Sequence, residues 1–302
     1  MKFNKKDIIS IRDFSKEEIV YLLDLAKKME NLSGKEKLLA GKVLATVFYE
    51  PSTRTRLSFE TAMLKLGGTV TGFSDPNASS VAKGETLYDT MKMLDGYIDI
   101  IVLRHPIEGA ARRAAETADV PVINGGDGAN QHPTQTLLDL YTIVKSKGKL
   151  DGLKVAMVGD LKYGRTVHSL AAALSHFNVK LIFVAPLSLK MPDDLLGELT
   201  VSYIETDKLE DAMQADVVYM TRIQKERFPD PIDYEKVKGV YVLSEKILQN
   251  AKKGLKVMHP LPRVDEIATD VDSTENAIYF EQAKNGVTMR QALLALLLGR
   301  LK

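Results

Sequence analysis

Phe48-Tyr49-Glu50-Pro51-Ser52-Thr53-Arg54-Thr55-Arg56 joins an apolar, β-branched run at residues 43–48 to a segment with the hydrophobic spacing of a helix. Three hydroxyl groups and two guanidinium groups fall within residues 52–56. A strand that leads directly into a helix presents unpaired backbone N–H groups at the positive end of the helix dipole, and these suit an anion. Hydroxyl donors and the planar arginine fork suit a phosphate in particular. The stretch therefore predicts a strand-to-helix turn that binds phosphate.

Composition narrows the class of protein. A chain of 302 residues favours two domains or one large α/β unit. The net charge of +1 gives no whole-chain argument for nucleic acid or membrane binding, and no apolar run approaches the roughly 20 residues that span a bilayer. There is no cysteine, and the five histidines lack metal-ligand spacing, so we expect no disulfide, no metal and no cofactor. The first residues lack the apolar region of a signal peptide, which predicts a cytoplasmic protein.

Strand and helix patterns alternate along both halves of the chain. This alternation predicts two doubly wound parallel-sheet domains of the α/β class, joined by helices. The strands expected in the first half are 43–48, 69–73, 98–103 and 120–123, and those expected in the second half are 154–158, 180–184, 216–220 and 256–258.

Helix signals set the expected domain boundaries. Ser15 and Glu18 have the spacing of a capping box at the start of a helix at 15–29, and Pro133 stands at the first position of a long helix. The apolar segment 287–300 is expected to return to the first half. The predicted domains are 1–131 together with 286–302, a bridging helix at 132–149, and 150–285.

Several hydrogen-bond donors follow the predicted strands of the first half, where ligands of doubly wound sheets bind. They are Ser52, Thr53, Arg54 and Thr55 after one strand, Arg104 after another, and His132 with Gln135 at the start of the bridging helix. Taken alone, Arg104 is typical of a surface salt bridge and His132 of helix capping. Their convergence at equivalent strand ends favours a shared anion.

The second half has three segments of the same kind. Residues 159–166 nearly match a P-loop, but Arg165 replaces its lysine and no acidic magnesium partner follows an apolar strand. Arg222 and Gln224 follow the strand at 216–220. Two arginines suit a dicarboxylate, since each fork can take one carboxylate. His259-Pro260-Leu261-Pro262-Arg263 follows the last strand and is either a rigid turn or a set of carbonyl acceptors for a ligand amide.

Four motifs together resemble the aspartate/ornithine carbamoyltransferase family. They are residues 52–56, 83–85, 132–135 and 259–262, in order and with matching spacing through nearly the whole chain. Ornithine-specific relatives carry cysteine in place of Pro260, so the resemblance is to the aspartate-specific branch. It implies transfer of the carbamoyl group of carbamoyl phosphate to L-aspartate, giving N-carbamoyl-L-aspartate and phosphate, the committed step of pyrimidine synthesis.

The resemblance also implies a role for each matching residue. The phosphate is held by Ser52, Thr53, Arg54, Thr55 and Arg104. The carbamoyl oxygen accepts from Thr55, Arg104 and His132, while the carbamoyl amide is oriented by Gln135 and the carbonyls of Leu261 and Pro262. The aspartate carboxylates are bound by Arg165, Arg222 and Gln224. Lys83 and either Ser79 or Ser80 lie on a loop that reaches a neighbouring subunit's site, which implies a homotrimer. Some relatives add regulatory chains and form dodecamers.

The chemistry needs no metal, because the departing phosphate can take the proton of the attacking amine. Fixed donors at the carbamoyl oxygen and the proximity of the two substrates lower the barrier. We hypothesise that Glu50 bridges to Arg165 and Arg227 when the domains close on both substrates.

Three other functions compete with this interpretation. A transferase for ornithine or a diamine needs an acidic residue for the second ammonium, whereas Arg222 and Gln224 occupy the expected position. A non-catalytic ligand-binding or scaffold protein predicts that some of the donors are lost. A P-loop enzyme predicts ATP binding with magnesium.

Overall fold

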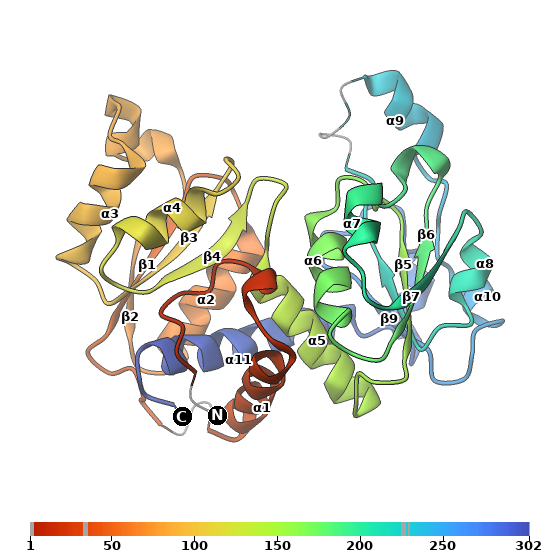
Figure 1. Cartoon of the computed structure of the whole chain (residues 1–302), viewed down its shortest axis with the longest axis horizontal. Coiled ribbons are helices and arrows are strands. Elements are labelled where there is room, and N and C mark those ends of the chain that lie inside the picture. Colours follow the sequence, from red (N-terminus) through yellow and green to blue (C-terminus); the bar gives the residue numbers. More distant parts are fainter. Residues whose placement is uncertain (1–2, 33–35, 225–227, 229, 302) are drawn as a thin grey trace. The chain divides into compact units, whose positions relative to one another are not determined.

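The computed structural model describes residues 3–32, 36–224, 228 and 230–301. Within these residues the chain forms two compact units, Met1–Tyr141 with Lys284–Lys302 and Thr142–Ala283 (Figure 1). The chain passes from one unit to the other within α5 (Pro133–Lys147) and again within α11 (Tyr279–Leu297). Residues 284–297 of α11 belong to the first unit, which confirms the predicted return of the C-terminal helix. Separate binding roles for the predicted domains stay a prediction.

The described part of the first unit contains a parallel sheet in the order β2-β1-β3-β4. Its strands are β1 (Val43–Phe48), β2 (Thr69–Phe73), β3 (Ile100–His105) and β4 (Val122–Asp127). Its helices before α5 are α1 (Lys16–Leu32), α2 (Thr53–Lys65), α3 (Leu87–Asp95) and α4 (Ala110–Thr117), and short 3-10 turns span Ile11–Asp13, Pro76–Ala78 and Ser80–Lys83.

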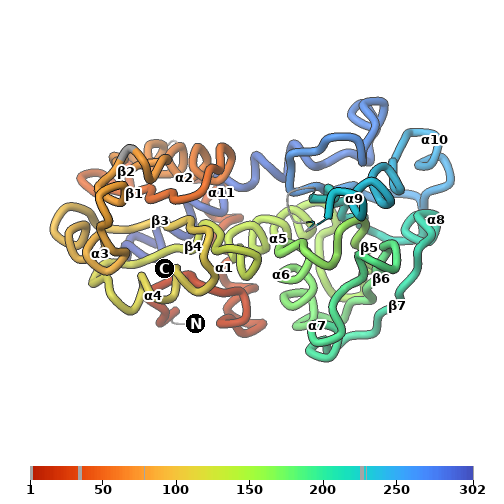
Figure 2. Tube along the Cα trace, turned by 90° about the horizontal axis from the view of Figure 1, so that it is seen from above, coloured from red at the N-terminus to blue at the C-terminus, as the bar shows by residue number. Residues whose placement is uncertain are grey.

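Both faces of this sheet are covered, as the apolar run in β3 predicts. Figure 1 shows α4 on one side of the sheet and α11 on the other, and Figure 2 shows the same sheet from above. On the α4 side, Ala45 and Val47 of β1 pack with Met91 of α3 and Ala114 of α4 in one buried cluster. Because all the strands are parallel, the segments that follow β1, β3 and β4 emerge at the same edge of the sheet.

The second unit contains a parallel sheet in the order β7-β6-β5-β8-β9 within its described residues. Its strands are β5 (Lys154–Val158), β6 (Lys180–Val184), β7 (Ser202–Thr206), β8 (Val217–Met220) and β9 (Lys256–Met258). Its helices besides α5 and α11 are α6 (Arg165–Leu174), α7 (Asp193–Gly197), α8 (Leu209–Ala212), α9 (Pro231–Val237) and α10 (Glu245–Leu248), with 3-10 turns at Leu187–Leu189 and Thr269–Ser273. None of the helices within the described ranges has the length and apolar character of a bilayer-crossing segment.

The predicted α/β class with two parallel sheets is confirmed, and the capping box forms, with Glu18 N donating to Ser15 Oγ at 3.2 Å and Ser15 N to Glu18 Oε2 at 2.9 Å. The sequence prediction missed β7. This strand lies at the edge of its sheet, and four of its five residues are exposed, so it lacks the apolar run of a buried strand. The prediction also ended β4 too early, because Asn124 to Asp127 resemble a turn but are buried strand residues.

A substitution at Gly159 tests whether the segment after β5 must pass close to the segment after β8. Its φ is +116°, and a Cβ atom there would lie 2.4 Å from the carbonyl oxygen of Thr221. We therefore expect Gly159→Ala to lower the free energy of unfolding by more than about 1 kcal/mol. The control Gly197→Ala adds a methyl group to the end of α7 with no atom within 4 Å and should stay within about 1 kcal/mol of wild type. Urea denaturation measures both, and equal stabilities of the two variants would contradict this account.

Candidate active site

The N-terminus of α2 lacks a side-chain cap from its N-cap residue, Ser52. Ser52 occupies the N-cap position with extended backbone, but its side chain makes no capping hydrogen bond. By contrast, Thr86 caps α3 by accepting from Asp89 N at 3.1 Å. The N–H groups of the first turn of a helix have no partners within that helix. The turn predicted to bind phosphate thus presents backbone donors and a hydroxyl that does not cap the helix.

Two arginines crowd this end of the sheet. Arg54 is exposed in the first turn of α2, and Arg104 is buried near the end of β3, the strand beside β1. Desolvation, followed by repulsion from Arg104, lowers the pKa of the Arg54 guanidinium. Because the two guanidinium groups repel each other, an anion bound beside both of them would relieve that repulsion.

Arg104 is held in place from two sides. Its Nη1 donates to the carbonyl oxygen of Gly125 at 3.1 Å, and its Nη2 forms an ion pair with Glu50. The salt bridge considered for Arg104 from the sequence therefore exists, but the arginine in it is buried rather than at the surface. Glu50 contacts a residue of its own unit. Its role in domain closure with Arg165 and Arg227 stays a prediction, and Arg227 lies outside the described residues.

Thr55 and His132 meet although 77 positions separate them in the sequence. The Thr55 Oγ1 and His132 Nε2 atoms are 3.4 Å apart, and both residues are buried. The backbone carbonyl of His132 also accepts from Gln135 N at 3.0 Å and from Thr136 N at 3.2 Å at the start of α5. These are the ordinary first bonds of a helix, and the ring of His132 faces the α2 turn. Helix capping by the His132 side chain stays a prediction.

A buried carboxylate that the sequence analysis missed shapes the segment leading to His132. Asp127 accepts from Gly109 N at 2.9 Å, Gln131 N at 3.1 Å, Asn124 Nδ2 at 2.8 Å and Asn130 Nδ2 at 3.1 Å. The sequence does show an aspartate near the end of a strand. It does not show that donors from separate segments of the chain will surround its carboxylate. Asp127 positions the chain between β4 and α5.

Gln135 is linked to a buried pair of charges. Its Nε2 donates to Asp139 Oδ1 at 2.9 Å, one turn along α5. Arg290 of α11 is also buried, with its guanidinium 4.9 Å from the centre of the Phe59 ring. Burial lowers the pKa of Arg290 to about 10, and the nearby Asp139 opposes that shift. Asp139 of α5 thus orients the amide of Gln135, and the charge of Arg290 from α11 acts on Asp139.

Ser79 and Lys83 lie on the segment between β2 and α3. Ser79 caps the turn Ser80–Lys83, since its Oγ accepts from Val81 N at 3.3 Å and donates to Pro76 O at 2.8 Å. Ser80 and Lys83 are exposed. The two hydrogen bonds of Ser79 are local, because both partners lie within three residues of it. Its predicted role in a neighbouring subunit stays a prediction.

In the second unit, Asp160 ties the segment after β5 to the segment after β8. Its carboxylate accepts from Tyr163 N at 2.9 Å and from Gln224 N at 3.4 Å, and its own N–H donates to Thr221 Oγ1 at 3.1 Å. Burial raises the pKa of Asp160, although hydrogen bonds from backbone N–H groups and the charge of Arg222 oppose the shift. These contacts hold together the two segments that carry Arg165 and Arg222, as predicted for neighbouring strand ends.

The same contacts argue against a P-loop at residues 159–166. A P-loop cradles phosphate with free backbone N–H groups. Here four N–H groups of the segment already have acceptors within the unit: Asp160 N donates to Thr221 Oγ1, Leu161 N to Leu189 O at 3.1 Å, Tyr163 N to Asp160 Oδ1, and Arg165 N to Tyr163 O at 3.1 Å. These four groups are therefore engaged in holding the turn itself and do not form a phosphate cradle.

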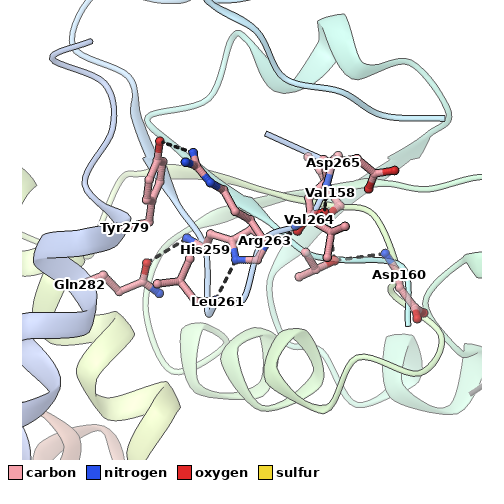
Figure 3. A network of polar contacts seen from close by, with 11 residues as sticks. Val158, Asp160, His259, Leu261, Arg263, Val264, Asp265, Tyr279 and Gln282 are labelled. Atoms are coloured by element: carbon pink, nitrogen blue, oxygen red, sulfur yellow. Dashed lines mark hydrogen bonds and ion pairs between the residues drawn. The ribbon is translucent and has the colours of Figure 1, made fainter. Parts of the chain in front are cut away.

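The turn after β9 forms a compact polar network (Figure 3). The buried His259 lies between the backbone of Leu261 and the carboxylate of Glu266, and its N–H donates to Gln282 Oε1 at 2.9 Å. Arg263 points toward Tyr279 and also forms an ion pair with Asp272. Leu261 has a φ of +58°, and Pro262 is exposed. In the part of the chain that the structure covers, no cluster of acidic, histidine or cysteine side chains suits a metal ion.

Comparison with known proteins identifies the family. Residues 6–145 match the family described as aspartate/ornithine carbamoyltransferase, carbamoyl-P binding domain, and residues 151–297 match its Asp/Orn binding domain. The chain belongs to the aspartate/ornithine carbamoyltransferase family. The family predicted from the four motifs is therefore confirmed.

Relatives within the family are similar over their whole length. The aspartate carbamoyltransferase catalytic subunit of Thermococcus kodakarensis is 57% identical, with 99% of each chain covered. The crystal structure of the Methanocaldococcus jannaschii catalytic subunit has a TM-score of 0.92 and 56% identity, covering 98% of both chains. The Trypanosoma cruzi aspartate transcarbamoylase in complex with carbamoyl phosphate and aspartate has a TM-score of 0.90 and 41% identity, covering 95% of both.

The raised pKa of Asp160 leads to a testable pH dependence. The folded protein holds the Asp160 proton more tightly than the unfolded chain, where the pKa is about 3.9. The contribution of this group to stability is therefore largest when it is protonated and declines as the pH rises through the raised pKa. In Asp160→Asn the side chain cannot ionise. We expect the wild type to lose stability relative to this variant as the pH rises above about 4, as measured by urea denaturation. A relative gain would contradict a raised pKa.

Proposed function

We propose that this chain is the catalytic subunit of an aspartate carbamoyltransferase. It transfers the carbamoyl group of carbamoyl phosphate to the amine of L-aspartate, releasing phosphate and N-carbamoyl-L-aspartate, as in the committed step of pyrimidine synthesis. The names of the full-length relatives and the ligands of the Trypanosoma cruzi complex support this assignment. The observation that carries it is the uncapped N-terminus of α2 beside Arg54 and Arg104.

Carbamoyl phosphate binds, in this proposal, at the edge of the first sheet. The phosphate is held by the α2 turn with Ser52, Thr53, Arg54 and Thr55, and by Arg104. A doubly charged phosphate offsets the repulsion between the two guanidinium groups and accepts the first-turn N–H groups. Gly125 lies against this turn, since a Cβ there would be 3.6 Å from Thr55 Cγ2.

The donors Thr55, Arg104 and His132 stabilise the charge that develops on the carbamoyl oxygen. Each fixed donor of this kind lowers a barrier by roughly 3–4 kcal/mol in comparable oxyanion holes. For His132 to donate from Nε2, that nitrogen must carry the proton, and Thr55 Oγ1 is then its neighbour at 3.4 Å. Gln135, Leu261 and Pro262 supply the oxygen acceptors for the carbamoyl NH₂ group.

L-Aspartate binds through the second unit. Arg165 and Arg222 each take one carboxylate, and Gln224 adds an amide, with Asp160 fixing the segments that carry them. Attack by the neutral amine forms the new C–N bond and breaks the bond from the carbamoyl carbon to phosphate oxygen. The amine proton leaves with the phosphate. An ornithine substrate fits poorly, because a second ammonium would face Arg222.

The proposed assembly is a homotrimer in which Ser79 and Lys83 complete the site of a neighbouring subunit. The exposure of Lys83 and the name "catalytic subunit" of the relatives support an oligomer. A plain trimer and a dodecamer with regulatory chains are the two alternatives for the complete assembly. A cytoplasmic location stays a prediction.

Two arginine variants test which arginine binds which of the two substrates. We expect Arg54→Ala to lower kcat/KM for carbamoyl phosphate by about 100-fold or more, because a charged donor to the reacting group is lost. Arg222→Ala should raise the KM for aspartate at saturating carbamoyl phosphate by at least about tenfold. Rates of carbamoyl aspartate formation measure both effects.

The control is Arg113→Ala, which removes an arginine whose side chain is 77% exposed and whose ion pair with Glu116 lies on the surface of α4. Surface pairs of this kind contribute little, so its kinetics should match wild type. Carbamoylation of ornithine but not aspartate by the wild-type chain would refute the assignment.

A mixing experiment tests the shared site. Arg54→Ala and Lys83→Ala should each be nearly inactive alone. When the two are dissociated, mixed and reassembled, some interfaces combine an intact α2 turn from one subunit with an intact Lys83 from another. Activity should therefore reappear in the hybrids. Recovery of no activity, with hybrid trimers present by native mass spectrometry, would contradict sharing of sites between subunits.

A further inference from the structure

His259 stands apart from the residues assigned so far, because it lies behind the turn rather than at its surface. It is 1% exposed. Its Nδ1 is 2.7 Å from Leu261 N, and its Nε2 is 2.6 Å from Glu266 Oε1. Both ring nitrogens thus have a partner within the second unit. The ring connects the backbone of the turn to a buried carboxylate.

The two contacts determine which nitrogen carries the proton. A backbone N–H group can only donate, so Nδ1 must accept from Leu261 and hold a lone pair. The neutral ring then carries its proton on Nε2 and donates it to Glu266. The second oxygen of Glu266 accepts from Val264 N at 3.1 Å and Asp265 N at 3.2 Å. Burial acts to raise the pKa of Glu266, but the contact with His259 and the backbone N–H groups outweigh it and lower that pKa.

These contacts act on a backbone conformation that needs support. Leu261 has a φ of +58°, in the left-handed region that a leucine rarely adopts. Such a conformation persists where the surroundings hold it. The bond from Leu261 N to Nδ1 holds the residue itself, and the bond from His259 N to Gln282 Oε1 anchors the chain two residues earlier.

We propose that His259, locked as the Nε2–H tautomer by Glu266, is a positioning residue that fixes the carbonyl groups of Leu261 and Pro262 for the carbamoyl amide. The inference rests on the proposed function, which supplies that amide. His259 does not touch the substrate. It acts through the Leu261 N–H, and its loss turns the acceptor carbonyls away from the NH₂ group.

Two substitutions separate the contacts of the ring. In His259→Asn, the side-chain oxygen takes the place of Nδ1 and can still accept from Leu261 N. In His259→Gln, the side-chain amide reaches the place of Nε2 and can still donate to Glu266, but the acceptor for Leu261 is lost. Both variants are smaller than histidine and leave polar groups in the same pocket. A purely structural histidine gives no reason for them to differ in substrate binding.

The experiment measures carbamoyl aspartate formation by the full-length chain, with circular dichroism to verify folding. We expect His259→Gln to raise the KM for carbamoyl phosphate by about tenfold, the factor expected when a hydrogen bond that holds the turn is lost, and His259→Asn to stay within about threefold of wild type. Equal KM values for the two variants would overturn the proposal.

Glu266→Gln tests the other side of the ring. It weakens the acceptor that fixes the tautomer, so the KM for carbamoyl phosphate should rise, by less than in His259→Gln. The matched control Glu275→Gln neutralises an exposed carboxylate of the same unit and should leave the KM unchanged. An equal rise in both variants would attribute the effect to net charge and overturn the role of Glu266.

A spectroscopic measurement covers the case in which His259→Gln does not fold. The chain has five histidines, so ¹H–¹⁵N spectra of histidine-labelled protein can be assigned by comparison with His259→Asn. The His259 ring should show a protonated Nε2 and an unprotonated Nδ1, and the opposite tautomer would refute the proposal. A wild-type chain that makes no carbamoyl aspartate, yet shows the expected tautomer, would refute the proposed function and with it the substrate role of His259.

Discussion

Buried carboxylates that accept hydrogen bonds from backbone N–H groups hold several of the segments on which the proposed site depends. Asp127 fixes the chain before α5, Asp160 joins the segments after β5 and β8, and Glu266 closes the turn after β9. Burying a charge is costly unless several donors meet it, and each of these groups has at least two. Since such a carboxylate is stable only with its donors in place, it fixes the positions of those donors.

This arrangement explains how loops can carry precise chemistry. Segments beyond the strand ends lack the regular hydrogen bonds of helices and sheets, so their backbone groups need other partners. The carboxylates provide these partners from within the fold. The cationic side chains Arg165 and Arg222 then project from segments that are already ordered, which reduces the reorganisation needed when a substrate binds.

The first unit uses its charges differently. Arg54 and Arg104 repel each other, and Glu50 compensates only part of that charge through its ion pair with Arg104. The α2 turn adds backbone donors that Ser52 leaves uncapped. A site with an excess of donors and positive charge gains most from an anion with several acceptor oxygens. The proposed preference for carbamoyl phosphate thus follows from this excess of donors and positive charge.

The sequence by itself determined the two parallel sheets, the strand ends that carry Arg54, Arg104 and Arg222, and the family, because apolar runs and motif residues are local signals. It missed β7, whose exposed residues at a sheet edge give no such signal. Only the tertiary structure decided that four N–H groups between residues 160 and 165 are already bonded while Ser52 leaves the N-terminus of α2 uncapped. It also decided which carboxylates are buried. The physical reason is that these bonds join segments far apart in the chain, such as Asp160 and Gln224, which become neighbours only when their strands pair.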